Sequence, residues 1–378
     1  MNRRRAIASR EGEFCSRRVG RARLVDVSDP TPRRLAADNF TPPSRTPWGG
    51  TKIRSRYKAG LDPSPGDPVV GESWEVSVEP SFPSRCADGE TTLEELVRAD
   101  PVAWLGERDA ARYGQTPLLV KLLDASDNLS VQVHPADGDP ALADGESGKP
   151  EAWVILEAEP DAGIYLGFRQ GVDRGDVERC ITKGGALDEL MQFVPVAAGD
   201  AFVIAAGTPH AIGAGVTLVE PQLVRPGRRG VTYRFWDWNR RYDASGRLDP
   251  AGSPRELHLR RSLEVTSWSG PRGAAFVAAC RRVATMPVGG RDGGMRRERV
   301  VDWRWFVVER WEGTGVLAVP SPGRMTAVTC VGGRVEVATA GGTLVLKMGE
   351  SGVVPAAAGA LAVTGKDALA FATTTAAA

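Results

Sequence analysis

The sequence has few histidines, no paired cysteines and no long apolar run, and each absence narrows the class of protein. Only 3 of the 378 residues are histidine. The 5 cysteines are scattered, without a C-x-x-C pair, which argues against a disulfide framework and is typical of a reducing cytosol. No apolar stretch approaches the roughly 20 residues that a spanning helix needs. We therefore predict a soluble, cytoplasmic protein.

The formal net charge is also small. At +1, it gives no electrostatic case for binding nucleic acid or an acidic membrane surface. Glycine (44) and proline (27) exceed average usage, which favours many short strands joined by turns. The sequence leaves open a monomer or a small homo-oligomer.

The first 38 residues are rich in arginine and lack apolar periodicity. Their first ten residues have no apolar segment of the kind found in secretory signals. No aromatic residues alternate with the arginines, as they would in an RNA-binding arm. We predict that residues 1–38 are a disordered leader, or that the start codon is placed too far upstream.

Beyond the leader, the patterns predict a mainly β fold with two short helical insertions. Helical periodicity occupies about residues 91–113, where Thr92 and Glu95 form a capping box, and about residues 171–192. Short apolar runs separated by Gly-containing turns form two β-rich blocks. We predict two jelly-roll barrels, a metal-binding domain at 39–270 and a smaller, metal-free barrel at 271–378.

The C-terminal block predicts short strands at regular spacing. Two glycine pairs, Gly332-Gly333 and Gly341-Gly342, have the sequence of hairpin turns. The strands expected around them are Val316–Val319, Met325–Val331, Val335–Ala338, Thr343–Lys347 and Ala360–Val363.

Two of the three histidines lie in segments that together offer a set of metal ligands. Gln132 and His134 are two residues apart, so on a strand their side chains point to the same face. Glu151 and His210 come from separate segments. Two imidazoles, an amide oxygen and a carboxylate suit Zn²⁺, with Co²⁺, Mn²⁺ or Fe²⁺ as substitutes. We predict one such ion per chain, at a catalytic site with open coordination positions.

The same segments carry a family resemblance over roughly residues 45–370. The chain resembles type I mannose-6-phosphate isomerases (phosphomannose isomerases), which are zinc-dependent cupins, in their short bacterial form. The matching phrases are WGGT at 48–51, GESWEVS at 71–77, LSVQVHP at 129–135, GKPE at 148–151, GTPHAI at 207–212, LVE at 218–220, TYRFWD at 232–237 and RELHL at 255–259.

The resemblance implies roles for individual residues. The zinc ligands would be Gln132, His134, Glu151 and His210. Arg234, Lys149 and Glu220 would be catalytic, and Lys121, Ser130 and Arg234 would bind the substrate. Both predicted barrels would then be of the cupin type.

The implied reaction interconverts D-mannose 6-phosphate and D-fructose 6-phosphate through a metal-stabilised enediolate. We favour Lys149 as the base, with Glu220 second. Lys149 is two residues from Glu151, so a nearby cation and partial burial would favour its neutral amine. Arg234 would stabilise the developing oxyanion or bind the phosphate.

Alternatives remain open: another metal-dependent sugar-phosphate isomerase, an Fe²⁺ oxygenase, or a non-catalytic sugar-binding cupin. The chain also departs from the family pattern. The family's His-Pro after GESWEVS is replaced by Glu79-Pro80, so a histidine at the pocket edge is missing. We expect a surface turn at the basic loop of Arg225, Arg228 and Arg229, and a packing role for His258.

Overall fold

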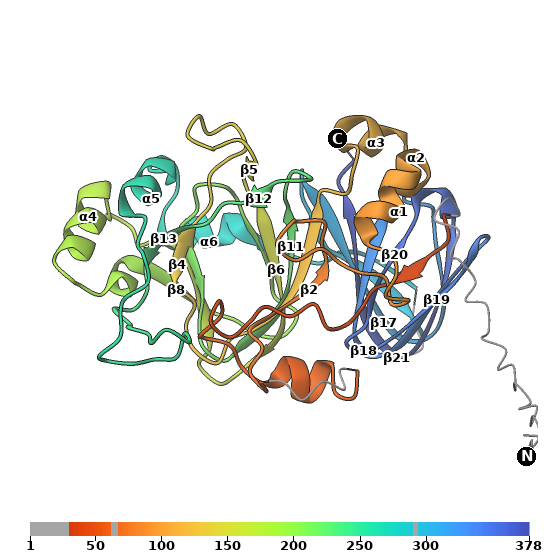
Figure 1. Cartoon of the computed structure of the whole chain (residues 1–378), viewed down its shortest axis with the longest axis horizontal. Coiled ribbons are helices and arrows are strands. Elements are labelled where there is room, and N and C mark those ends of the chain that lie inside the picture. The colour runs from red at the N-terminus through yellow and green to blue at the C-terminus, as the bar shows by residue number, and fades with distance from the viewer. Residues whose placement is uncertain (1–29, 62–66, 290–293, 378) are drawn as a thin grey trace, which may run out of the picture.

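The computed structural model describes residues 30–61, 67–289 and 294–377, and strands dominate its regular structure (Figure 1). The predicted mainly β class is confirmed. Residues 1–29 of the predicted leader lie outside the described residues. Among the described strands, the pairings leave each sheet open at its edges and close none of them into a barrel.

Two sheets build the part of the molecule that contains the histidines. The first has the order β13-β4-β10-β7-β8, with bounds Tyr233–Trp236, Val131–Val133, His210–Ile212, Gly163–Phe168 and Met191–Pro195. The second has the order β14-β9-β6-β11-β3-β2, with bounds Arg281–Arg282, Ala201–Ile204, Glu151–Ala158, Val216–Leu223, Leu118–Asp124 and Glu72–Val76. Buried side chains from both sheets, including Leu166, Ile212, Trp153 and Leu218, form one shared apolar core. A short parallel pair, β5 (Glu146–Ser147) with β12 (Arg229–Gly230), lies outside both sheets.

A third sheet, drawn in blue in Figure 1, is built mainly by the C-terminal part of the chain. Its order is β1-β20-β18-β21-β17-β16-β15, and β19 pairs with β18. The bounds in that order are Arg33–Arg34, Ser351–Val354, Thr326–Thr339, Leu361–Thr375, Phe306–Val319, Arg296–Asp302 and Thr285–Gly289, and β19 is Gly342–Lys347. Apolar side chains cover its inner face, among them Trp311, Val328 and Ala370.

One predicted hairpin turn in this sheet is wrong. Gly332 and Gly333 lie inside β18, at a shift in its register with β21, so Met325–Val331 and Val335–Ala338 belong to one bulged strand. Gly333 has a φ of +57°, and a Cβ there would lie 2.1 Å from the Asp367 carbonyl oxygen, so only glycine fits the bulge. The second pair, Gly341-Gly342, does connect β18 to β19.

The end of the predicted leader also needs correction. Arg33 and Arg34 form β1, which pairs with Val353 and Gly352 of β20, so residues 30–38 are not a disordered segment. A two-residue strand leaves no periodic pattern in the sequence, because its pairing partner lies more than 300 residues away.

The helices lie outside the sheets (Figure 1). The first insertion contains α1 (Leu93–Ala99), α2 (Pro101–Leu105) and α3 (Glu107–Tyr113), and the second contains α4 (Arg174–Thr182) and the 3₁₀ turn η2 (Leu187–Leu190). The remaining helical elements are η1 (Ile53–Tyr57), α5 (Leu259–Val265), α6 (Gly273–Cys280) and η3 (Ala356–Ala358). The Thr92–Glu95 capping box is present at the start of α1. No helix in the described part of the chain is long and apolar enough to cross a membrane.

The two β regions share an apolar core. Leu96 and Trp104 of the first insertion pack in a cluster with Val120 of β3 and with Phe306 and Phe371 of the third sheet. A buried ion pair crosses the same junction: Lys58 Nζ lies 2.9 Å from Glu75 Oε1 and donates to the Gly349 carbonyl oxygen. The boundary predicted at residue 270 stays a prediction; β14, just beyond it, still pairs with β9 of the second sheet.

Candidate metal centre and its cavity

Three strand ends bring the predicted ligand residues together. β6 begins at Glu151, β10 begins at His210, and His134 directly follows β4. Gln132 pairs with His210 across β4 and β10. Its neighbours Val131 and Val133 are fully buried on the opposite face, as the alternation of side chains on a strand requires.

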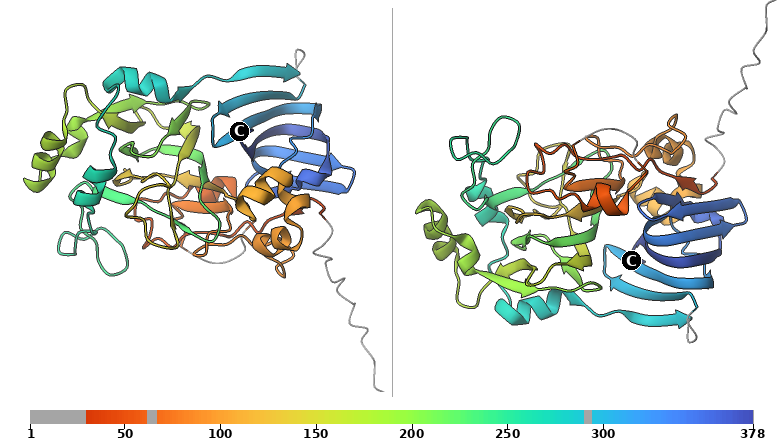
Figure 2. Two further views of the ribbon diagram at one scale, coloured as in Figure 1. Left: turned by 90° about the horizontal axis from the view of Figure 1, so that it is seen from above. Right: turned by 90° about the horizontal axis from the view of Figure 1, so that it is seen from below.

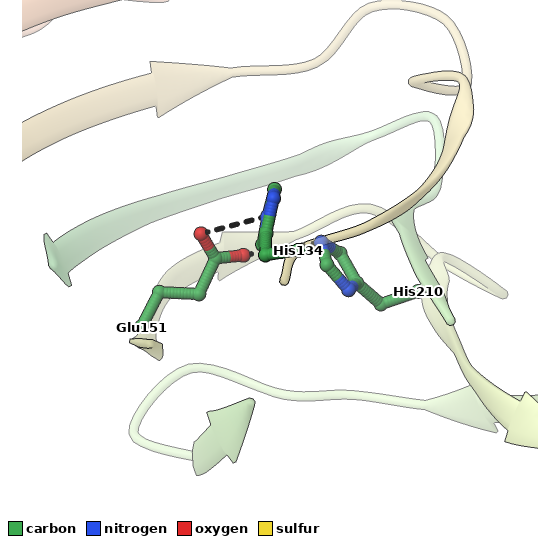
Figure 3. A group of neighbouring side chains, drawn as sticks. All are labelled: His134, Glu151 and His210. Atoms are coloured by element: carbon green, nitrogen blue, oxygen red, sulfur yellow. Dashed lines mark ion pairs between the residues drawn. The ribbon is translucent and has the colours of Figure 1, made fainter. Parts of the chain in front are cut away.

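His134, Glu151 and His210 form a compact group (Figure 3). Their ligand atoms all lie within 4.8 Å of one another. Glu151 contributes both oxygens, Oε2 at 3.3 Å from His134 Nε2 and Oε1 at 3.2 Å from His210 Nε2. All three side chains are buried, with at most 3% of each residue exposed. Buried groups this close together are typical of a metal site.

The two imidazoles are oriented by backbone carbonyl groups. His134 Nδ1 lies 3.0 Å from the Val231 oxygen, and His210 Nδ1 lies 2.8 Å from the Thr208 oxygen. A ring N–H that donates to a carbonyl leaves the other nitrogen as a free lone pair. His134 Nε2 is buried and makes no hydrogen bond to any described residue. Burial, followed by the charge of Lys149, lowers the pKa of His134 to about 3, so the ring is neutral. The donor set therefore fits a divalent cation.

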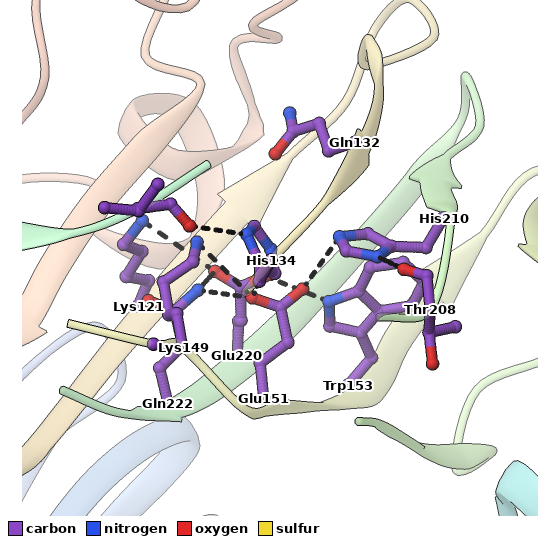
Figure 4. Close-up of polar contacts among 12 residues, drawn as sticks. Lys121, Gln132, His134, Lys149, Glu151, Trp153, Thr208, His210, Glu220 and Gln222 are labelled. Carbon is purple, nitrogen blue, oxygen red and sulfur yellow. Dashed lines mark hydrogen bonds and ion pairs between the residues drawn. The ribbon is translucent and has the colours of Figure 1, made fainter. Parts of the chain in front are cut away.

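Gln132 lies beside this group. Its amide nitrogen is 3.2 Å from Ser130 Oγ, and its side chain lines the same small cavity as Glu151 and His210. In Figure 4 the amide oxygen is on the side facing the other three residues. The structure thus brings the four predicted ligand residues together, and their coordination of a metal stays a prediction.

Lys149 and Gln222 contact the carboxylate of Glu151. Lys149 Nζ lies 3.4 Å from Glu151 Oε2, and Gln222 Nε2 donates to the same oxygen at 2.9 Å. Burial alone would raise the pKa of Glu151, but Lys149 and His134 together hold this pKa well below its ordinary value. The carboxylate is therefore ionised, as a metal ligand must be.

Glu220 belongs to the same network (Figure 4). Gln222 Nε2 donates to Glu220 Oε2 at 2.6 Å, and Trp153 Nε1 donates to Glu220 Oε1 at 2.9 Å. Burial, followed by the negative charge of Glu151, raises the pKa of Glu220 to about 8. Sequence reasoning gave Gln222 no role, although its position two residues after Glu220 on β11 could have placed it on the same face.

Lys121 points from β3 into this polar region. Its Nζ lies 3.5 Å from Glu72 Oε2, 3.8 Å from Glu220 Oε2 and 4.4 Å from the centre of the Trp74 ring. Burial pushes the pKa of Glu72 up, but Lys121 and the Trp74 indole N–H hold it below its ordinary value. Glu72 is another polar residue of the site that the sequence did not single out.

A cavity of about 200 Å³ opens beside the candidate ligands. Arg234 lines it and is held by Ser130 Oγ at 3.3 Å and by the Glu256 carbonyl oxygen at 2.8 Å. Glu79 lines the same cavity, so a carboxylate occupies the edge where the family histidine is missing. The cavity is also lined by Arg45, Lys121, Gln132, Lys149, Gln222 and Arg255.

The remaining predicted residues lie around the site. Arg225 and Arg229 form ion pairs with Asp137 and Glu146 at 2.9 and 2.6 Å, and neither lines the 200 Å³ cavity. His258 accepts a hydrogen bond at its Nδ1 from the Arg234 backbone N–H at 3.0 Å. It therefore positions the strand that presents Arg234, in line with the expected packing role.

Comparison with known proteins finds relatives of one kind. Residues 43–156 match the family model described as phosphomannose isomerase type I, catalytic domain. A mannose-6-phosphate isomerase from Streptococcus mutans is 29% identical over 311 residues, which are 82% of this chain and 88% of the relative. The chain is thus similar to type I phosphomannose isomerases, and its residues 43–156 match their catalytic domain.

Solved structures of phosphomannose isomerases share the fold. The mannose 6-phosphate isomerase of Bacillus subtilis superposes with a TM-score of 0.72 at 25% identity, covering 91% of this chain and 99% of that one. A structure of the Salmonella typhimurium enzyme bound to its substrate (f6p) and zinc has a TM-score of 0.63 at 17% identity, covering 92% of this chain and 100% of that one.

Proposed function

We propose that this protein is an isomerase that interconverts D-mannose 6-phosphate and D-fructose 6-phosphate. The observation that supports this most directly is the buried group of His134, Glu151 and His210 beside a cavity lined by lysine and arginine. A metal centre next to a cationic cavity suits a phosphorylated sugar whose carbonyl must be polarised. The family named by the comparisons performs this reaction.

We propose Gln132, His134, Glu151 and His210 as the residues that hold the cation. Nitrogen and oxygen donors without thiolate favour zinc, with Co²⁺, Mn²⁺ or Fe²⁺ as substitutes. When bound there, the ion would polarise the sugar carbonyl and stabilise the enediolate.

The reaction moves one proton between two carbons. A base removes the C2 proton of the aldose while the C1 carbonyl oxygen takes up negative charge. The same proton returns to C1, and the C2 hydroxyl proton passes to the C1 oxygen, so no atom is gained or lost.

We propose Lys149 as this base and Glu220 as a group behind it. Lys149 lines the 200 Å³ cavity, whereas Glu220 lies behind, bonded to Trp153 and Gln222. Lys149 Nζ lies 3.4 Å from Glu151 Oε2, so it would lie beside a cation held by Glu151. With its pKa near 8, Glu220 can accept or release a proton close to neutral pH.

We propose that the cationic residues around the cavity bind the substrate. We propose that Arg234, which Ser130 and Glu256 hold in place, stabilises the oxyanion or binds the phosphate through its planar fork. Lys121, between two carboxylates, would orient a sugar hydroxyl on the inner wall.

The test is a coupled assay of fructose 6-phosphate formation from mannose 6-phosphate with purified, zinc-loaded protein. Turnover is expected in the presence of zinc and should be lost after chelation and restored by added metal. If metal analysis shows one bound ion per chain and no turnover occurs, the chain instead acts on another sugar phosphate or binds sugars without catalysis.

A further inference from the structure

The C-terminal half contains a cavity of about 560 Å³, larger than the cavity beside the candidate ligands. It is lined by residues of β16, β17, β18 and β21, the curved strands drawn in blue shades in Figure 2. Small-molecule sites usually occupy about 300–1,000 Å³, so this volume is sufficient for a metabolite. The third sheet therefore has a cavity of the size of a binding site.

The sheet pairing brings two loops to the same end of this cavity. Phe306 pairs with Thr375, and Ala327 pairs with Thr373, so the starts of β17 and β18 lie on either side of the end of β21. The residues just before these strands include Arg304 and Arg324, and both line the cavity.

Four arginines but only two carboxylates line the cavity. Arg297 donates to Glu309 at 2.7 Å and Arg299 to Asp302 at 2.8 Å, which accounts for both carboxylates. In the described part of the chain, the other two guanidinium groups form no ion pair: Arg304 stacks over Trp305, and Arg324 donates only weakly to the Pro322 carbonyl oxygen, at 3.3 Å. An excess of positive charge in a hollow with apolar walls attracts an anion.

Two further residues of the cavity wall offer contacts that a bare anion would not use. Trp303 is half-buried and lines the cavity with a flat apolar surface. Thr326 also lines the cavity; its Oγ1 is buried and has no hydrogen-bond partner among the residues that the structure describes. Buried hydroxyl groups normally have a partner, so a ligand oxygen would complete this one.

We propose that this cavity is a second binding site, separate from the metal centre, for a small organic phosphate monoester such as a sugar phosphate. The unpaired forks of Arg304 and Arg324 would bind the phosphate oxygens, and the dianion would offset the two excess positive charges. Trp303 would pack against the organic part, and Thr326 would hydrogen-bond to it. This site requires neither the metal nor the isomerase activity.

Equilibrium dialysis of the intact, zinc-loaded protein against labelled fructose 6-phosphate tests this. The double variant Arg304→Gln/Arg324→Gln should bind one equivalent per chain fewer than the unmodified protein, with unchanged isomerase turnover. As the matched control, Arg296→Gln removes an exposed arginine of the same strand as Arg297 and should lose no equivalent. Because the readout is a difference, it holds whether or not the metal centre also binds the sugar phosphate.

Equal numbers of bound ligands in the unmodified protein and the double variant would overturn the proposal. If the double variant does not fold, Thr374→Glu gives the same test by placing a carboxylate in the cavity wall. Inorganic phosphate should bind this site about tenfold more weakly, since it cannot contact Trp303. Equal affinity for inorganic phosphate and fructose 6-phosphate would refute the proposal that the site recognises an organic phosphate.

Discussion

The cavities of the two β regions are both lined by cationic side chains, but they differ in the groups that accompany these cations. The cavity near β4, β6 and β10 adjoins two neutral imidazoles and an ionised carboxylate, with lysines close by. The cavity of the third sheet contains arginines, and two of them carry no carboxylate partner among the described residues. The two regions share a β architecture, so the side chains at the strand ends, rather than the architecture, determine what each can bind.

Removing a metal ligand should have the largest effect, and this effect should be confined to the region that contains the histidines. His134→Ala is expected to reduce metal affinity by more than the roughly 100-fold seen when an outer-sphere residue is lost, because a direct donor disappears. Turnover should fall with the bound metal. Metal analysis after dialysis measures the first effect and the coupled assay the second.

The third histidine provides the control for this variant. His258→Ala should keep its metal, since His258 contacts the Arg234 backbone rather than the ligand group. A His134→Ala protein with a full complement of zinc would refute the ligand assignment.

Replacing the base should separate chemistry from metal binding. Lys149→Met is expected to lower kcat by about 10²–10⁴-fold while zinc stays bound, because general-base catalysis contributes on that order. Lys183→Met, at an exposed position on the second helical insertion, should leave kcat unchanged. Normal turnover in Lys149→Met would transfer the role of the base to Glu220.

The junction between the two regions can be tested through its buried ion pair. Lys58→Met should lower the free energy of unfolding by about 3–5 kcal/mol, because Glu75 is left charged and buried without its cation. Denaturant unfolding measures this loss. The double variant Lys58→Met/Glu75→Leu should recover most of the stability, and failure to recover it would show that the pair does not act as a unit.

A smaller effect is expected from the amide that joins the two carboxylates. Gln222→Leu keeps the volume but removes the donor to Glu151 and Glu220, so kcat should fall by about 10–100-fold. The surface change Gln170→Leu is the matched control. If Gln222→Leu has the turnover and metal content of the unmodified protein, the bridge has no part in orienting the ligand.

The sequence predicted those features of the fold and the site that are determined by a few neighbouring residues. The alternation around Gln132 and His134 and the capping box at Thr92 are set within a few residues, and the structure has both. The fold class followed from many short apolar runs. Glycine pairs are ambiguous, because positive φ serves turns and bulges alike, and Gly333 lies in a bulge.

Long-range contacts could not be predicted in this way. The pairing of β1 with β20 joins segments that share no sequence pattern. The contact of Glu72 with Lys121 likewise depends on how β2 pairs with β3, which no spacing along the chain reveals. The convergence of Glu151 on the two histidines was expected from the combination of ligand types and from the family resemblance. No spacing along the chain reveals it, because the strand of Glu151 lies in the opposite sheet.

The most direct test of the metal centre is anomalous diffraction at the zinc edge from crystals grown with zinc. One strong peak is predicted at about 2.0–2.2 Å from His134 Nε2, His210 Nε2 and a Glu151 oxygen, with the Gln132 amide oxygen as the fourth protein donor. A peak elsewhere in the molecule, or one that contacts fewer than two of these four side chains, would contradict the account.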